Sequence, residues 1–134
     1  MLDPQGALIY TMVLVSGAET SIGAAEQAII GDIIGHMPVF RGVNGDKLAH
    51  HLDACAELLS GDDGLEKTLA AIKAALPERL RETAYAIACD LIASDGEATQ
   101  EELQILELIR HRLEIGRLAA AAIERGARAR FQKL

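Results

Sequence analysis

Apolar residues recur along this chain at intervals of three and four, and alternation of apolar with polar residues is nowhere sustained. Intervals of three and four place side chains on one face of an α-helix, whereas a half-buried strand alternates with period two. One such helical face carries Ile22, Ile29, Ile33 and Met37. The pattern therefore predicts an all-α fold, a compact bundle of about seven helices without a sheet.

Glycine, proline, asparagine and aspartate mark the ends of the expected helices. The clearest loop is PVFRGVNGD at residues 38–46, and GDDG at 61–64 forms a second turn. Pro77 suits the first turn of a helix, where its missing amide hydrogen is not needed. The first expected helix is apolar nearly all round, so we expect it to be central and buried. The expected helices span about 5–18, 22–37, 47–60, 65–76, 77–94 and 99–113, with a seventh beginning near 116.

The composition indicates a single domain, residues 1–134, with an aliphatic core. Half of the 134 residues are apolar, but only two Tyr and two Phe are aromatic. A core of Leu, Ile, Val and Ala is typical of packed helices. Cys55 and Cys89 have no metal-ligand spacing and form no disulfide framework. We interpret them as small buried hydrophobic residues in a reducing compartment.

Charge is distributed unevenly along the chain. The net charge is −7, and residues 110–134 carry seven Lys and Arg against two Glu, which leaves an acidic body. An acidic chain with so few aromatic residues is not expected to bind nucleic acid. The basic C-terminal segment is interpreted as a solvated helix end, and the alternative is that it contacts an acidic protein partner or, peripherally, an anionic membrane. The N-terminus lacks a basic secretory region, and the uncharged run 4–18 is too short to cross a bilayer, so we expect a cytoplasmic protein.

A shift of 76 residues aligns the chain with itself as a weak internal repeat. Glu19 then falls on Asp95, Glu26 on Glu102 and Ile33 on Ile109, whereas Gln27 falls on Leu103 as a mismatch. The alignment predicts that hairpins 5–37 and 77–113 lie side by side, related by an approximate two-fold axis. Chance similarity of two amphipathic hairpins is the alternative.

The stretch ASDGEATQEEL at 93–103 places acids at the junction of two expected helices. Thr99 and Glu102 fit a capping box, in which each side chain accepts from the other's backbone amide. The first repeat keeps Glu26 but has Gly23 in place of the threonine, so capping does not explain both acids. Asp95 and Glu19 lie near helix C-termini, where the helix dipole disfavours a carboxylate.

Convergence of these four acids would create an all-oxygen site. Oxygen ligands suit a hard divalent cation, and we expect Ca²⁺ in preference to Mg²⁺. Glu97 and turn carbonyls would complete the ligand shell. The alternative is a set of solvated acids and helix caps without a cation. The candidate metal ligands are Glu19, Glu26, Asp95 and Glu102.

Other polar residues have simpler interpretations. The pair His50 and His51, with Asp53 nearby, is interpreted as a surface feature, because adjacent helical residues point about 100° apart. His36 is expected to cap a helix C-terminus. Asp90 lies among apolar residues and must either face outward or pair with an arginine such as Arg117.

The passage ETAYAIACDLIASDGEATQEELQILELI resembles the signature of the tellurite-resistance TerB family: an apolar helix, an acidic glycine turn, an acid pair and a Leu/Ile-rich helix. The segment LIYTMVLVSGAETSIGAAEQAIIGDII resembles the family's first hairpin. The resemblance implies a small all-helical domain with an acidic, cation-binding face. On that analogy Asp95 and Glu102 match the motif acids, and Glu19 and Glu26 match their counterparts.

Together these features predict a TerB-like, cation-responsive interaction module in bacterial stress or tellurite and metal-oxyanion response, without enzymatic activity. The first alternative is a metal-free scaffold or adaptor that binds a protein partner or an anionic membrane surface. The second is a hydrolase with a carboxylate-bound metal, which is disfavoured because no activating base is evident. Measurements of Ca²⁺ binding and of catalytic turnover would separate these three classes, and the first predicts binding without turnover.

Overall fold

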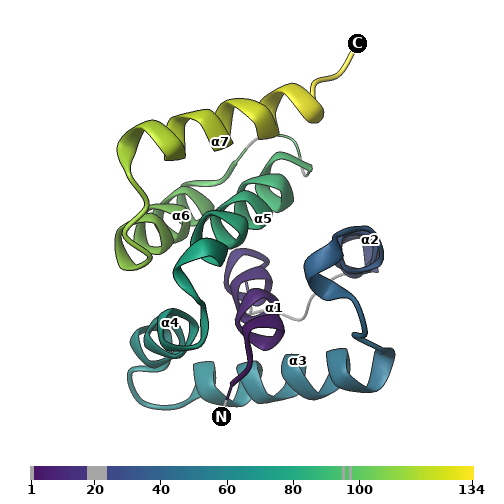
Figure 1. The fold of residues 1–134 in the computed structure, drawn as a ribbon, viewed down its shortest axis with the longest axis vertical. Helices are drawn as coiled ribbons and strands as arrows, with labels where there is room; N and C mark the ends of the chain where they lie inside the picture. Colours follow the sequence, from purple (N-terminus) through teal and green to yellow (C-terminus); the bar gives the residue numbers. More distant parts are fainter. Residues whose placement is uncertain (1, 18–23, 95, 97) are drawn as a thin grey trace.

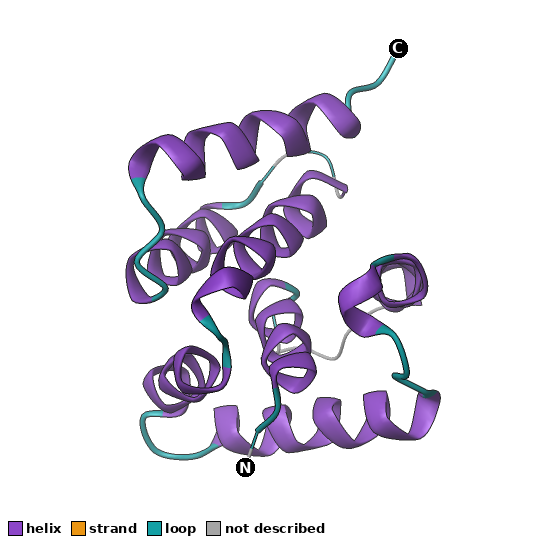
Figure 2. Cartoon of the chain, in the orientation of Figure 1, coloured by secondary structure: helices purple, strands orange, loops and turns teal. Residues whose placement is uncertain are grey.

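A computed structural model of the chain describes residues 2–17, 24–94, 96 and 98–134, and for residues 24–26 only the backbone. The described residues form seven α-helices and two short 3₁₀ helices, and none of them lies in a strand (Figure 2). The predicted all-α fold is therefore confirmed. The elements in order are α1 (Pro4–Val15), α2 (Ala24–His36), η1 (Pro38–Phe40), α3 (Gly45–Ser60), α4 (Gly64–Ala75), η2 (Glu78–Leu80), α5 (Arg81–Ser94), α6 (Gln100–Arg112) and α7 (Arg117–Arg130).

Helix α1 lies at the centre of the fold, as its sequence predicts. Asp3 caps its N-terminus by accepting from the Gly6 amide at 2.7 Å, and Pro4 occupies the first turn. Every residue from Gly6 to Val15 is buried. Helices α3, α4 and α5 pack around it (Figure 1). A helix that is apolar on all sides can be accommodated only in such a surrounded position.

Helix α5 joins this central region to the C-terminal helices. It packs on α1 with one face and on α6 and α7 with others (Figure 1). Its buried residues include small side chains, such as Ala84 and Ala88, as well as large ones, such as Tyr85 and Leu91. Alanines allow neighbouring helices to approach closely, so α5 can be buried on several sides.

Two helix ends differ from the sequence prediction by three or four residues, and the other described ends differ by two at most. The first helix ends at Val15 rather than residue 18, because Gly17 adopts φ +76°, a left-handed conformation that stops the helix. The fifth begins at Arg81 rather than Pro77, because Pro77 has an extended backbone with ψ 152° and precedes the 3₁₀ turn η2. Among the described residues no helix is both long and apolar enough to cross a membrane.

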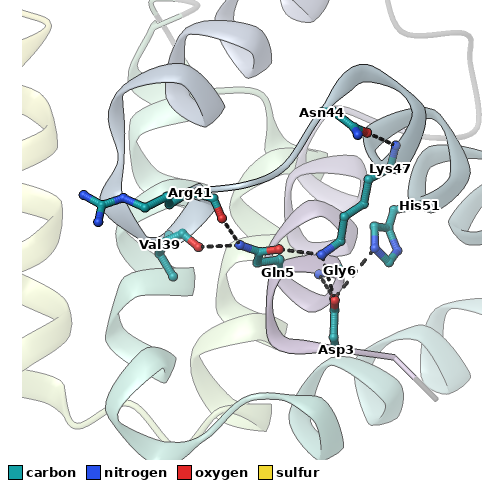
Figure 3. A network of polar contacts seen from close by, with 8 residues as sticks. All are labelled: Asp3, Gln5, Gly6, Val39, Arg41, Asn44, Lys47 and His51. Atoms are coloured by element: carbon teal, nitrogen blue, oxygen red, sulfur yellow. Dashed lines mark hydrogen bonds and ion pairs between the residues drawn. The ribbon is translucent and has the colours of Figure 1, made fainter.

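A polar network attaches the N-terminus of α1 to α3 and to the segment after η1 (Figure 3). Lys47 donates to Gln5 Oε1 at 2.6 Å and forms an ion pair with Asp3 at 3.0 Å. Gln5 Nε2 donates in turn to the backbone carbonyls of Val39, at 3.1 Å, and Arg41, at 2.9 Å. The network therefore holds three segments of the chain together at one end of the central helix.

His51 belongs to this network, and its predicted surface position is wrong. The side chain is buried and lies against the edge of Tyr10, with Nε2 3.7 Å from Asp3 Oδ1. Burial lowers the pKa of His51, and the negative charge of Asp3 opposes that shift. A Cβ at residue 6 would lie 2.5 Å from His51 Cε1, so Gly6 leaves the space that the imidazole fills. His50, its neighbour, is exposed as predicted.

The segments assigned to the two predicted hairpins are in contact, because α1 and α2 both pack on α5. Helix α2 additionally packs on η1. The connection between α1 and α2, residues 18–23, lies outside the described residues. The approximate two-fold relation between the hairpins therefore stays a prediction.

Candidate binding groove

The predicted cation site falls largely outside the described residues. Glu19 and Asp95 are among the residues that the structure does not describe, as is the auxiliary acid Glu97, and for Glu26 only the backbone position within α2 is described. Within the described ranges no group of three or more His, Cys, Asp or Glu side chains could hold a metal ion. The cation site therefore stays a prediction.

Glu102 is the one predicted metal ligand whose side chain is described, and it forms a helix cap. Its Oε1 accepts from the Thr99 amide at 2.9 Å, and the Glu102 amide donates to Thr99 Oγ1 at 3.1 Å. The predicted capping box at the start of α6 is thus confirmed. These two hydrogen bonds account for the position of Glu102 without a cation.

A groove of about 700 Å³ lies over the C-terminal end of α5, between the start of α6 and the end of α7. This volume falls within the range of about 300–1,000 Å³ that is common for ligand pockets. The apolar residues that line the groove include Ile92, Ala93, Ala98, Leu103, Leu106 and Phe131. We call this feature the α5–α6–α7 groove.

The connection between α6 and α7 determines where the groove opens. Helix α6 ends in a tight turn in which Glu114 adopts φ +57° and the Ile115 amide donates to the Arg110 carbonyl at 3.0 Å. The two helices run in opposite directions from this turn, and both pack on α5 (Figure 1). The groove lies at the far end from the turn, because Leu103 is near the start of α6 and Phe131 follows the end of α7.

Two large apolar side chains of the groove remain accessible to solvent. Leu103 is 45% exposed and Phe131 is 39% exposed. Beside them, Gly96 and Ala98 contribute the small residues of one wall. The acidic stretch at 93–103 that was predicted to hold a cation therefore supplies four groove-lining residues: Ala93, Gly96, Ala98 and Leu103.

The charged residues of the groove are concentrated on the α7 side. Arg128, Lys133 and Glu124 line it. The Glu124 carboxylate accepts a 2.5 Å hydrogen bond from the Tyr85 hydroxyl. Burial, together with this bond to the carboxylate, raises the pKa of Tyr85. The phenol therefore stays protonated and keeps Glu124 hydrogen-bonded, whereas the two cationic side chains have no ion pair within the described part of the chain.

Asp90, the carboxylate among apolar residues of α5, pairs with an arginine as predicted. The partner is Arg130, whose Nη2 lies 2.5 Å from Asp90 Oδ1, rather than Arg117. Arg117 is at the start of α7, whereas Asp90 lies near the C-terminal end of α5 and so faces the other end of α7. The pair joins these two helices beside the groove.

Both cysteines are buried free thiols, as predicted. Cys89 lines the groove, and burial raises its pKa to about 12. Cys55 lies away from the groove, and burial raises its pKa to about 12 as well. Because the thiolate is the nucleophilic form, neither side chain is activated for covalent chemistry near neutral pH.

The groove was not predicted from the sequence, although one residue indicated it. Leu103 is a mismatch in the internal repeat, where the first copy has Gln27. Gln27 is exposed on α2, and the corresponding position on α6 is likewise exposed but apolar. A leucine at a position that the repeat leaves open to solvent indicates a surface that another apolar group can cover.

Comparison of the chain with protein-family models, with curated proteins and with solved structures finds no match. The TerB resemblance therefore rests on the sequence motifs alone.

Proposed function

We propose that this chain is a non-enzymatic interaction module that binds an apolar segment of a protein partner in the α5–α6–α7 groove. The observation that carries the proposal is the groove itself, about 700 Å³ in volume and lined by accessible apolar side chains. Covering Leu103 and Phe131 would remove apolar surface from water, at roughly 25 cal/mol per Å² buried. Aromatic residues such as Phe131 are also enriched at the centres of protein interfaces.

Two further features support binding rather than catalysis. The groove's only thiol, within the residues that the structure describes, belongs to Cys89, whose raised pKa keeps it protonated. The carboxylate of Glu124 is engaged by Tyr85. Neither group is prepared as a nucleophile or as a general base, so the groove offers shape and charge rather than reactive chemistry.

The cation response implied by the TerB resemblance is compatible with this proposal. Gly96 and Ala98 line the groove. In the sequence they flank Glu97, and Gly96 directly follows Asp95. A Ca²⁺ ion bound by Asp95 together with Glu19, Glu26 and Glu102 would therefore hold one wall of the groove. Partner binding would then depend on the ion, as expected of a module in bacterial stress or metal-oxyanion response.

Binding of an apolar probe tests the proposal. The dye anilinonaphthalene sulfonate, which fluoresces when it leaves water for an apolar site, should bind the folded protein at the groove. Leu103→Glu should weaken dye binding at least about fivefold, because the dye would then face a carboxylate that resists desolvation. Leu118→Glu is the matched control, because Leu118 is 85% exposed on α7 and does not line the groove.

Both leucines are exposed, so both variants should keep the helical circular dichroism and the melting temperature of the wild type. Equal dye binding by the two variants would overturn the proposal, since the dye would then bind elsewhere. Absence of dye binding to the wild type would do the same.

A further inference from the structure

We infer that the segment bound in the α5–α6–α7 groove is an acidic amphipathic helix, which lays its apolar face on Leu103, Leu106 and Phe131 and turns carboxylates toward Arg128 and Lys133. This inference rests on the proposed function of the groove and adds the chemistry of the partner.

The shape favours a helix. Helices α6 and α7 run antiparallel from a tight turn and both pack on α5, so the open end of this pair is bordered by three helices. Antiparallel helices pack at interaxial distances of about 8–10 Å, with side chains of one filling the grooves of the next. A fourth helix between the start of α6 and the end of α7 would contact all three in this way.

The charge favours an acidic helix. On the α7 side of the groove, Arg128 and Lys133 are exposed, and neither forms an ion pair within the described ranges. The only carboxylate among the described lining residues, Glu124, already accepts from Tyr85. Residues 110–134 together carry seven basic against two acidic side chains. A carboxylate on the bound helix would therefore find two available cations along this edge.

Two designed peptides provide the test. Each has about 18 residues, or five helical turns, with leucine repeating at intervals of three and four along one face. The polar positions are glutamate in the acidic peptide and lysine in the basic peptide. The protein carries a net charge of −7, so non-specific attraction favours the basic peptide, and selective binding of the acidic one requires the local cations. Affinities are measured by fluorescence anisotropy at about 0.15 M salt, where the Debye length is about 8 Å.

The acidic peptide should bind the wild type, and Arg128→Glu combined with Lys133→Glu should weaken its binding about tenfold. The matched control is Arg117→Glu combined with Arg125→Glu. It changes the net charge equally, but neither residue lines the groove. The control should therefore weaken binding no more than about twofold. Leu103→Glu should abolish binding of the acidic peptide.

Three results would overturn the inference while leaving the groove function intact. These results are binding of the basic peptide as tight as that of the acidic one, an equal loss of affinity in the two double variants, and binding of the dye without binding of either peptide. Self-association of the wild type that Leu103→Glu abolishes would also overturn it, because the occupant would then be a second copy of this chain. Failure of the dye test itself would instead overturn the proposed function.

Discussion

Thr99 and Glu102 satisfy each other's backbone amides at the start of α6, at 3.1 Å and 2.9 Å. Thr99→Ala removes the hydroxyl that accepts from the Glu102 amide. The variant should lower the free energy of unfolding by about 1 kcal/mol, the usual cost of losing an N-cap side chain. Urea denaturation followed by circular dichroism measures this change. Thr99→Ser, which keeps the hydroxyl, should stay within about 0.5 kcal/mol of the wild type. An unchanged stability of the alanine variant would show that the cap contributes nothing in solution.

The same cap provides a clean test of the predicted cation site. Glu102→Gln keeps a side-chain oxygen for the capping box but removes the negative charge. Ca²⁺ at millimolar concentration should raise the melting temperature of the wild type, because a ligand bound only to the folded state stabilises it. Glu102→Gln and Asp95→Asn should each abolish this rise, whereas Thr99→Ala should keep it. If Ca²⁺, Mg²⁺, Mn²⁺ and Zn²⁺ all leave the wild-type melting curve unchanged, the four acids form no cation site.

Acid should destabilise the fold in two steps. Burial lowers the pKa of His51 below 6.5, so the unfolded state binds this proton more readily than the folded state. The contribution of His51 to the free energy of unfolding is therefore complete above about pH 6.5. It is lost as the pH falls below that value. Burial alone would raise the pKa of Asp3, but the Gly6 amide and Lys47 lower it below 3.8. The contribution of Asp3 to the free energy of unfolding is consequently lost only as the pH falls through 3.8.

Substitutions separate these two steps. His51→Gln should remove the upper step from a plot of melting temperature against pH, and Asp3→Asn should remove the lower one. Asparagine can still cap α1, so the fold should persist. In the Asp3→Asn variant, the pKa of His51 measured by NMR should fall further, because the Asp3 charge is what raises it. A rise in that pKa would contradict the contact between the two side chains.

Gly64 is required by space rather than by backbone conformation. A Cβ at this position would lie 2.1 Å from the backbone oxygen of Leu59, which cannot move aside cheaply. Gly64→Ala should therefore cost at least about 1–3 kcal/mol of stability. Gly61→Ala is the control in the same turn, because its Cβ would lie 3.6 Å from the Leu58 oxygen and its φ is −84°. Denaturant midpoints of the two variants should differ clearly, and equal midpoints would show that α3 and α4 rearrange without cost.

Binding to anionic surfaces should depend on the basic C-terminal segment. Vesicles with a large fraction of phosphatidylserine should bind the protein weakly at low salt and lose it as salt rises. Replacing Arg125, Arg128 and Lys133 with glutamine should remove this binding. Arg130 is left intact in this variant because it pairs with Asp90. Deleting residues 124–134 is a poorer test, because it also removes the buried Ala127 and the hydrogen bond from Tyr85 to Glu124. Unchanged vesicle binding by the glutamine variant would mean that these charges are only solvated.

The helices could be predicted from sequence because their signals are local. Apolar spacing, the loop at 38–46, the turn at 61–64 and the capping box of Thr99 and Glu102 are each read from a few neighbouring residues. The central position of α1 could also be predicted from the sequence, since a helix without a polar face is stable only where other helices surround it. These inferences needed no knowledge of how the helices cross.

The groove and the position of His51 depend on contacts between distant segments, and no local pattern contains them. His51 is buried because Gly6, 45 residues earlier in the chain, leaves room for its ring. The groove exists because α6 and α7 leave one end of α5 uncovered. The pairing of Asp90 with an arginine was predicted, but its partner Arg130 was not, because the pairing depends on the direction in which α7 runs along α5.

The central position of α1 has a consequence for synthesis on the ribosome. Its last residue, Val15, is made about 80 residues before the end of α5, the helix that closes over it. At roughly 5–20 residues per second, the most apolar helix of the chain waits about 4–16 s for that partner. The nascent chain therefore presents an aggregation-prone segment throughout most of its translation, and this interval is when a ribosome-associated chaperone would protect it.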